Sequence, residues 1–174
     1  YALSSDVCTW VQEVDNAYRQ QKLFCAPDSA ILNNQNEDGV YGSAETLTGA
    51  KAVVTVGTTS QFHVENYIAQ FGLAPSDITE LNMDFSAQYQ AFISGEADLM
   101  SASGVSVYQI EDAGYVCLGT FEDCVGLNLC DGITVRNEVL AKRRADIVAY
   151  VKCVQRAIDE LGGDADLRFE YLKQ

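Results

Sequence analysis

The spacing of apolar residues predicts a helix near the start of the chain. Over 7–18, four apolar side chains recur at helical intervals, which is typical of an amphipathic helix. The following segment, 26–49, is rich in Gly and Asn and is typical of a connecting loop, with a short strand expected at 30–32. The apolar positions of the first helix are Val7, Trp10, Val11 and Val14.

The middle of the chain alternates between strand and helix patterns. The β-branched run at 52–56 predicts a strand buried on both faces, and further strands are expected at 78–83 and 97–100. The helices between them end at Gly72 and Gly95. Because the turns are short, this order predicts right-handed crossovers in a mainly parallel sheet. The apolar stripes of the two helices are Val64, Tyr67, Ile68 and Phe71, and Tyr89, Phe92 and Ile93.

The last third of the chain predicts one more sheet region and a long helix. A helix is expected at 105–113, extended segments at 115–121 and 133–136, and an acidic turn at 122–126 between them. The long helix breaks at Gly162, and a short helix is expected after it. The stripe of the long helix is Ile147, Val151, Val154, Ile158 and Leu161.

Length and charge limit the possible partners. The chain has 174 residues, with 11 basic and 25 acidic ones, and a net charge of −14. This length fits one domain with a real core. The negative charge disfavours nucleic acid and anionic membranes as partners, and no apolar run is long enough to insert into a membrane. The chain begins at Tyr1 and not at Met, as expected of a mature or trimmed form, and a cloning boundary would give the same start.

The six cysteines predict three disulfides and an oxidising compartment. They show no closely spaced metal-binding pattern, so neither a metal nor another cofactor is expected. The alternative is a set of buried free thiols in a reducing compartment. Six cysteines allow 15 connectivities. Proximity along the chain favours Cys8–Cys25, Cys117–Cys124 and Cys130–Cys153.

The turn after the first buried strand is the clearest candidate for a binding site. Gly57 permits a close backbone approach, and Thr58, Thr59 and Ser60 lead into a helix N-terminus, where unpaired N–H groups attract anions. The segment lacks the pattern of a Walker loop and of a dinucleotide-binding loop. The alternative is that Thr59 or Ser60 only caps its own helix.

The polar residues give little support for catalysis. His63 is the only histidine, and it lies inside a predicted helix. No nucleophile-elbow motif is present, and the acidic pairs stand at turns or helix ends, where solvation explains them. The chain is therefore not expected to be an enzyme.

Three stretches of the sequence together resemble a known family. They are SAETLTGAKAVVTVGTTSQFHVENYIAQFGLAPSDITELNM, YQAFISGEADLM and DGITVRNEVLAKRRADIVAYVKCVQRAIDEL. In this order they are similar to the second lobe of type II periplasmic solute-binding proteins, in the branch that serves nitrate, sulfonate, taurine and thiamine-precursor transporters. The resemblance implies an α/β fold, a three-layer lobe in which helices flank a mainly parallel sheet. It makes 1–174 a single domain, with a divergent helix and connector at 1–42, the lobe at 43–161 and a tail helix at 162–174.

The same resemblance implies binding of a small anionic or zwitterionic solute outside the cytoplasm. The protein would be periplasmic or secreted and would deliver its ligand to an ABC-type transporter permease or a receptor. About ninety residues of the family's first lobe have no counterpart here, so a second chain or another part of the precursor is expected to complete the cleft. The alternative is a structural or interaction module that keeps the lobe but has lost its ligand, because the loop at 103–105 departs from the family pattern. The implied ligand contacts are Gly57, Thr58, Thr59, Ser60, Asp84, Phe85, Ser101 and Ser103.

Overall fold

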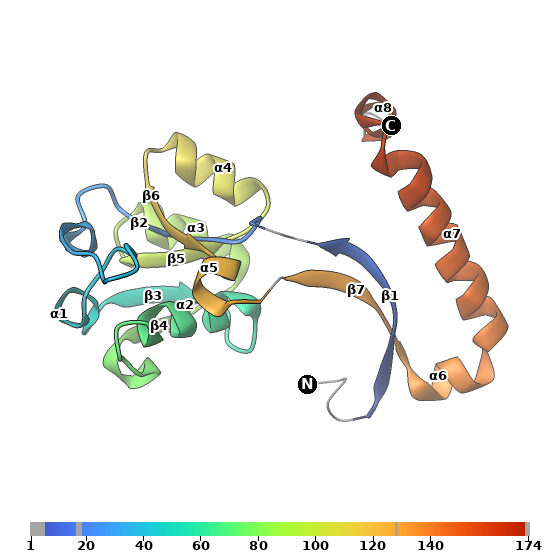
Figure 1. Cartoon of the computed structure of the whole chain (residues 1–174), viewed down its shortest axis with the longest axis horizontal. Helices are drawn as coiled ribbons and strands as arrows, with labels where there is room; N and C mark the ends of the chain where they lie inside the picture. Colours follow the sequence, from blue (N-terminus) through green and yellow to red (C-terminus); the bar gives the residue numbers. More distant parts are fainter. Residues whose placement is uncertain (1–5, 17–18, 128, 173–174) are drawn as a thin grey trace. The chain divides into compact units, whose positions relative to one another are not determined.

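The computed structural model describes residues 6–16, 19–127 and 129–172, which fall into two compact units. The sheet unit comprises 19–127 and 129, and the ribbon unit comprises 6–16 together with 130–172. Figure 1 labels the helices and strands of both units. The sequence predicts one domain, 1–174, with segments at 1–42, 43–161 and 162–174, and that division stays a prediction.

A five-stranded sheet forms the centre of the sheet unit, with the strand order β4-β3-β5-β2-β6. Strand β3 pairs in parallel with β4 and β5, whereas β2 runs antiparallel between β5 and β6. The mainly parallel sheet predicted from the sequence is therefore confirmed. The strands are β2 (Lys22–Cys25), β3 (Lys51–Val54), β4 (Thr79–Asn82), β5 (Leu99–Ala102) and β6 (Val116–Thr120).

Helices cover both faces of this sheet, because successive strand residues point to opposite sides. Ala52 and Val54 pack in one core cluster, together with buried residues of α2 (Thr59–Ala69). Val53 packs in a second cluster, with buried residues of α3 (Phe85–Ile93) and α4 (Val105–Asp112). The three-layer α/β architecture is thus confirmed (Figure 1).

Three short segments of the sheet unit differ from the sequence prediction. The strand predicted at 30–32 is wrong, because η1 (Ala30–Asn33) is a 3-10 helix begun by a hydrogen bond to the Ser29 side chain. The acidic turn is the helix α5 (Phe121–Val125), which a capping box at Thr120 begins. The sequence pattern predicts no strand at 22–25, where the structure has β2. The remaining short helices are α1 (Ala44–Leu47) and η2 (Pro75–Asp77).

The ribbon unit consists of two paired strands followed by helices. Strand β1 (Cys8–Asn16) pairs antiparallel with β7 (Cys130–Arg136), about 120 residues later in the chain. The helix predicted over 7–18 is therefore wrong within 8–16, and positions 17 and 18 lie outside the described residues. Its apolar residues do not alternate as in a regular strand, and the register with β7 is irregular between Trp10 and Gln12 and between Glu13 and Asp15. The helices that follow are α6 (Asn137–Lys142), α7 (Arg144–Gly162) and α8 (Ala165–Leu172).

No described side chain of the ribbon unit is buried, even on the 19-residue helix α7. The predicted stripe of α7 is only half-buried; part of it, with Val11 of β1, lines an apolar groove of about 350 Å³. Both core clusters consist of sheet-unit residues. None of the helices in the described ranges is long and apolar enough to cross a membrane.

The six cysteines are free thiols in the structure. Cys25 is fully buried in the core of the sheet unit, which shields it from partners outside that core. Cys117 pairs across the ladder with Phe24 and so faces the α3 and α4 side, while Cys124 packs in the α2-side cluster. The structure forms none of the predicted disulfides, Cys8–Cys25, Cys117–Cys124 and Cys130–Cys153, and this set stays a prediction.

We expect Gly42→Ala to destabilise the sheet unit by about 2–4 kcal/mol. Gly42 has a φ of +122°, and an added Cβ would lie 3.0 Å from the Tyr67 hydroxyl and 3.1 Å from Leu47 Cδ1. Gly49→Ala is the matched control, because its φ is +81° but nothing lies within 4 Å of an added Cβ. Urea unfolding followed by circular dichroism measures both, and equal losses in the two variants would contradict the packing argument.

Candidate functional site

The parallel strands β3, β4 and β5 end at one edge of the sheet, which we call the carboxyl edge. Each strand is followed by a helix, so the N-termini of α2, α3 and α4 gather there. The residues implied as ligand contacts lie in or beside the three turns, as the sequence leads us to expect. They are Gly57, Thr58, Thr59 and Ser60 after β3, Asp84 and Phe85 after β4, and Ser101 and Ser103 at the end of β5.

The turn before α2 satisfies most of its own side chains. The Thr58 hydroxyl donates to the Thr55 carbonyl over 2.7 Å. The Ser60 hydroxyl lies 2.9 Å from Thr58 Oγ1 and accepts the Thr55 N–H over 3.2 Å. The Gly57 N–H donates to Gln61 Oε1 over 2.8 Å. Two of the three hydroxyls and the glycine N–H are therefore already engaged.

The first N–H groups of α2 remain open. The helix begins at Thr59, and the Thr58 side chain makes no capping hydrogen bond. Within the described ranges, the backbone N–H groups of Thr59, Ser60 and Gln61 have no hydrogen-bond partner. The alternative in which Thr59 or Ser60 caps the helix is thus not formed. Three open N–H groups at the positive end of a helix dipole favour a nearby anion.

A hydrogen-bonded cluster fastens the turns after β3 and β4 to each other. The Val56 N–H donates to Asn82 Oδ1 over 3.1 Å, and Thr55 Oγ1 donates to the Met83 carbonyl over 2.9 Å. The buried Gln88 of α3 donates to Thr55 Oγ1 over 2.8 Å and to the Met83 carbonyl over 3.1 Å. These hydrogen bonds hold the turn before α2, and with it the N-terminus of that helix, in a fixed position.

The other implied contacts differ in exposure. Asp84, Phe85 and Ser103 are exposed at the carboxyl edge, and Asp84 makes no side-chain cap on α3. Ser101 is buried, with its Oγ 2.9 Å from His63 Nδ1 and 2.8 Å from Gln21 Nε2. The structure therefore brings three of these four residues to the surface of the site and commits Ser101 to the interior.

His63 is a neutral interior side chain. It is fully buried, its ring packs edge-on against Phe121 with centroids 5.5 Å apart, and Nε2 makes no hydrogen bond of ordinary geometry. Burial lowers the pKa of His63 to about 4, although the Thr120 backbone and the Glu122 and Asp123 carboxylates act in the opposite direction. A base that is buried and neutral does not face a substrate at the carboxyl edge.

Sequence reasoning missed a pocket of about 250 Å³ at the start of β2 and α4. The sequence pattern does not predict β2, so it does not place the first residues of this strand beside the turn at Gly104. One feature of the sequence does indicate this pocket. Only three basic residues occur between 19 and 129, and two of them, Arg19 and Lys22, lie three positions apart. The lining residues are Arg19, Gln20, Lys22, Gly104, Val107 and Tyr108.

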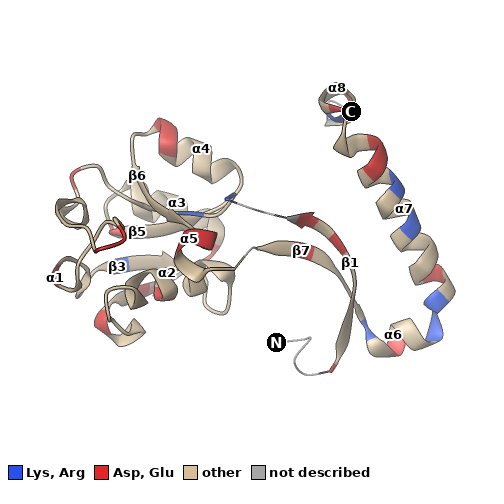
Figure 2. Cartoon of the chain, viewed as in Figure 1, with Lys and Arg blue, Asp and Glu red and all other residues tan. Residues whose placement is uncertain are grey.

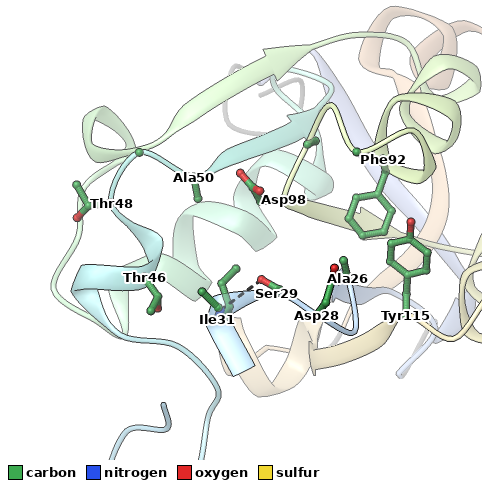
Figure 3. Close-up of a pocket in the computed structure, with 14 residues that line it drawn as sticks. Ala26, Asp28, Ser29, Ile31, Thr46, Thr48, Ala50, Phe92, Asp98 and Tyr115 are labelled. Carbon is green, nitrogen blue, oxygen red and sulfur yellow. Dashed lines mark hydrogen bonds between the residues drawn. The ribbon is translucent and has the colours of Figure 1, made fainter. Parts of the chain in front are cut away.

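A larger pocket of about 440 Å³ lies at the opposite edge of the sheet, where β3 and β5 begin (Figure 3). Figure 3 shows the Phe92 and Tyr115 rings together on one side of it, with centroids 4.8 Å apart. Asp28 and Asp98 add two carboxylates, and Asp98 Oδ2 accepts the Lys51 N–H over 2.8 Å. None of the implied ligand contacts lines this pocket, and its carboxylates repel anions. Among the described residues no three potential metal ligands gather in one place.

Comparison with known proteins gives a family match. The family model described as "NMT1/THI5 like" matches residues 28–164, which is most of the chain. No curated protein sequence matches the chain.

Several solved structures share the fold. A putative periplasmic sulfonate-binding protein SsuA from Methylobacillus flagellatus KT has a TM-score of 0.71 and 18% identity, with 99% of this chain and 49% of that chain covered. The MOPS-bound SsuA from Xanthomonas axonopodis pv. citri has a TM-score of 0.68 and 16% identity, with 90% and 50% covered. Arginine-bound truncated ArgBP from T. maritima has a TM-score of 0.58 and 18% identity, with 91% and 63% covered. The chain thus spans about half the length of the sulfonate-binding proteins it resembles.

The buried His63 makes stability depend on pH. Its pKa is about 4 in the folded chain against an ordinary 6.5, so the unfolded chain binds more protons between these values. The free energy of unfolding should therefore fall as pH drops from 6.5 to 4, by about 3 kcal/mol from this residue.

The variant His63→Asn isolates this contribution. Asp123, whose pKa is lowered mainly by its hydrogen bonds to Thr120, also favours higher pH, but it is present in both proteins. Urea unfolding at a series of pH values should show the wild type losing about 3 kcal/mol more than the variant. A difference that stays constant from pH 7 to pH 4 would show that His63 is not held neutral.

Proposed function

The chain belongs to the NMT1/THI5-like family, and on this basis we propose that it binds a small anionic or zwitterionic solute at the carboxyl edge of the sheet unit. The observation that supports this most directly is the set of three unpartnered N–H groups at Thr59, Ser60 and Gln61. They point outward from a helix N-terminus, where a carboxylate, sulfonate or phosphate oxygen is stabilised.

Backbone donors suit this strongly acidic protein. Fourteen acidic and three basic residues lie between 19 and 129, so the overall field repels anions. Backbone N–H groups act over hydrogen-bonding distance and do not titrate, so they hold an anionic group locally against that field. A zwitterion gains further, because its cationic end interacts favourably with exposed carboxylates such as Asp84 at the same edge.

The length of the chain bears on how the site is completed. The sulfonate-binding proteins with the same fold are about twice as long, so their remaining half has no counterpart in these 174 residues. A half site leaves much of a ligand in water and binds weakly. We therefore assign the second wall of the cleft to another lobe or a second chain. The complete protein would act outside the cytoplasm and pass its solute to an ABC-type permease or a receptor, without catalysis.

A ligand-free interaction module is the second candidate. The burial of Ser101 and the exposed loop at 103–105 favour it, because they withdraw one implied contact and alter another. Isothermal titration calorimetry separates the two functions. A chain that releases no heat with MOPS, arginine or sulfate in Tris chloride would favour the module.

The test of the N–H site is Thr59→Pro. Proline is tolerated at the first position of a helix, and Thr58 already has the extended backbone, with ψ at 174°, that a following proline requires. The substitution removes one open N–H and leaves the helix in place. Loss of one hydrogen bond to a charged group should weaken MOPS binding by roughly 10- to 100-fold.

Thr59→Ala is the matched control, because it removes the hydroxyl and keeps the N–H. We expect its affinity to stay within about twofold of the wild type. Circular dichroism should show the same helix content in all three proteins. Equal MOPS affinity in wild type and Thr59→Pro would exclude the α2 N-terminus as the binding site.

A further inference from the structure

Basic side chains are scarce in the sheet unit, and their distribution is uneven. Figure 2 shows acidic residues over much of this unit and few basic ones. Of the three basic residues between 19 and 129, Arg19 and Lys22 line the same pocket of about 250 Å³. The third, Lys51, lies at the opposite edge, where β3 begins. Two of the three cations of this unit therefore lie beside one cavity, with the carboxylates of Glu111, Glu122 and Asp123 close to them.

The strand register places this pocket at the carboxyl edge. Because β2 is antiparallel, its first residue, Lys22, pairs with Ala102 at the end of β5 and with Thr120 at the end of β6. Strand β5 separates β2 from β3, so the start of β2 and the turn after β3 are about 10 Å apart across the sheet. The pocket is therefore separate from the N–H groups of α2, although it lies along the same edge.

Neighbouring carboxylates hold the two basic residues in place. Lys22 Nζ lies 2.6 Å from Glu111 Oε1 of α4. This hydrogen bond is the main cause of a raised pKa at Lys22, which remains a cation. An ammonium group has three donors, so Glu111 leaves two for a ligand. The Arg19 backbone N–H donates to Glu122 Oε1 over 3.0 Å, which fixes the start of this segment beside α5.

Helix α4 supplies the remaining wall. Gly104, Val107 and Tyr108 occupy neighbouring positions on one side of its first turns and line the pocket. Val107 is buried, whereas the Tyr108 side chain is 68% exposed and offers a flat apolar surface. The N–H groups of Val105 and Ser106 have no partner within the described ranges. The pocket thus combines two cations, a helix N-terminus and an aromatic ring.

We propose that this pocket is a second anion-binding site, which takes a small organic anion with a flat apolar body, such as an aromatic sulfonate or carboxylate. Arg19, Lys22 and the first N–H groups of α4 hold the anionic group, and the Tyr108 ring packs against the apolar body. The inference rests on the proposed function in placing solute binding at the carboxyl edge, but it depends on other residues than the α2 site.

The test uses benzenesulfonate as the probe, with neutral benzenesulfonamide as the matched ligand, in isothermal titration of the 174-residue chain. We expect Arg19→Gln and Lys22→Gln each to weaken benzenesulfonate binding by about five- to tenfold. Lys51→Gln removes the same charge at the opposite edge and should leave the affinity unchanged. Benzenesulfonamide should not bind measurably. Equal affinity in the wild type, Arg19→Gln and Lys22→Gln would overturn the proposal, as would an equal loss in Lys51→Gln.

Glu111→Gln provides a test with the opposite sign. Removing the carboxylate that competes for Lys22 should tighten benzenesulfonate binding by about two- to threefold, which no loss of folding could produce. Weaker binding in this variant would contradict the assignment.

Thr59→Pro separates the two sites, because it should leave benzenesulfonate binding unchanged. If Thr59→Pro reduces benzenesulfonate affinity while Arg19→Gln does not, the pocket assignment fails and the α2 site stands. If Thr59→Pro leaves the MOPS affinity unchanged while Arg19→Gln lowers the benzenesulfonate affinity, the α2 assignment is wrong and the pocket assignment is supported.

Discussion

The hydrogen-bonded ladder that holds β2 between β5 and β6 is the constraint on which the sheet unit depends. β2 is the antiparallel strand of the sheet, and Leu23, Phe24 and Cys25 are fully buried. Leu23 and Cys25 belong to one core cluster and Phe24 to the other, so this strand ties both layers of helices together. It also attaches β6 to the rest of the sheet. Because it runs against its neighbours, it begins where they end, which places Lys22 at the carboxyl edge.

The sequence predicts the elements whose signals are local. The β-branched run at 52–56 gives β3, and Gly72 and Gly95 mark the ends of the helices that follow the strands. Strand β2 has four residues, too few for a period to show, and its burial depends on partner residues 76 to 98 positions away in the chain. The segment 8–16 has apolar spacing that fits a helix, yet pairing with β7 decides its structure. Local secondary-structure propensity carries no information about a pairing strand so far along the chain.

The same distinction applies to the candidate site. Its location could be predicted, because turns after parallel strands meet at one edge whatever their side chains do. The sequence does not predict which polar groups remain available to a ligand, because this depends on hydrogen bonds to residues that are close in space. The Thr58 and Ser60 hydroxyls are engaged within the turn, and Ser101 is engaged by His63 and Gln21. The groups that remain open at the start of α2 are therefore mainly backbone N–H groups, which the amino-acid sequence does not reveal.

The distance along the chain between β1 and β7 orders the steps of folding during synthesis. Cys8 pairs with Arg136, so the ribosome must add about 130 residues before this pair of strands can form. At roughly 5–20 residues per second, that interval is on the order of ten seconds. Every strand of the five-stranded sheet lies between β1 and β7 in the sequence. The sheet unit can therefore fold while β1 still has unpaired backbone groups. During that time β1 resembles an exposed edge strand, open to pairing with other chains, and its two acidic residues, Glu13 and Asp15, act against such pairing.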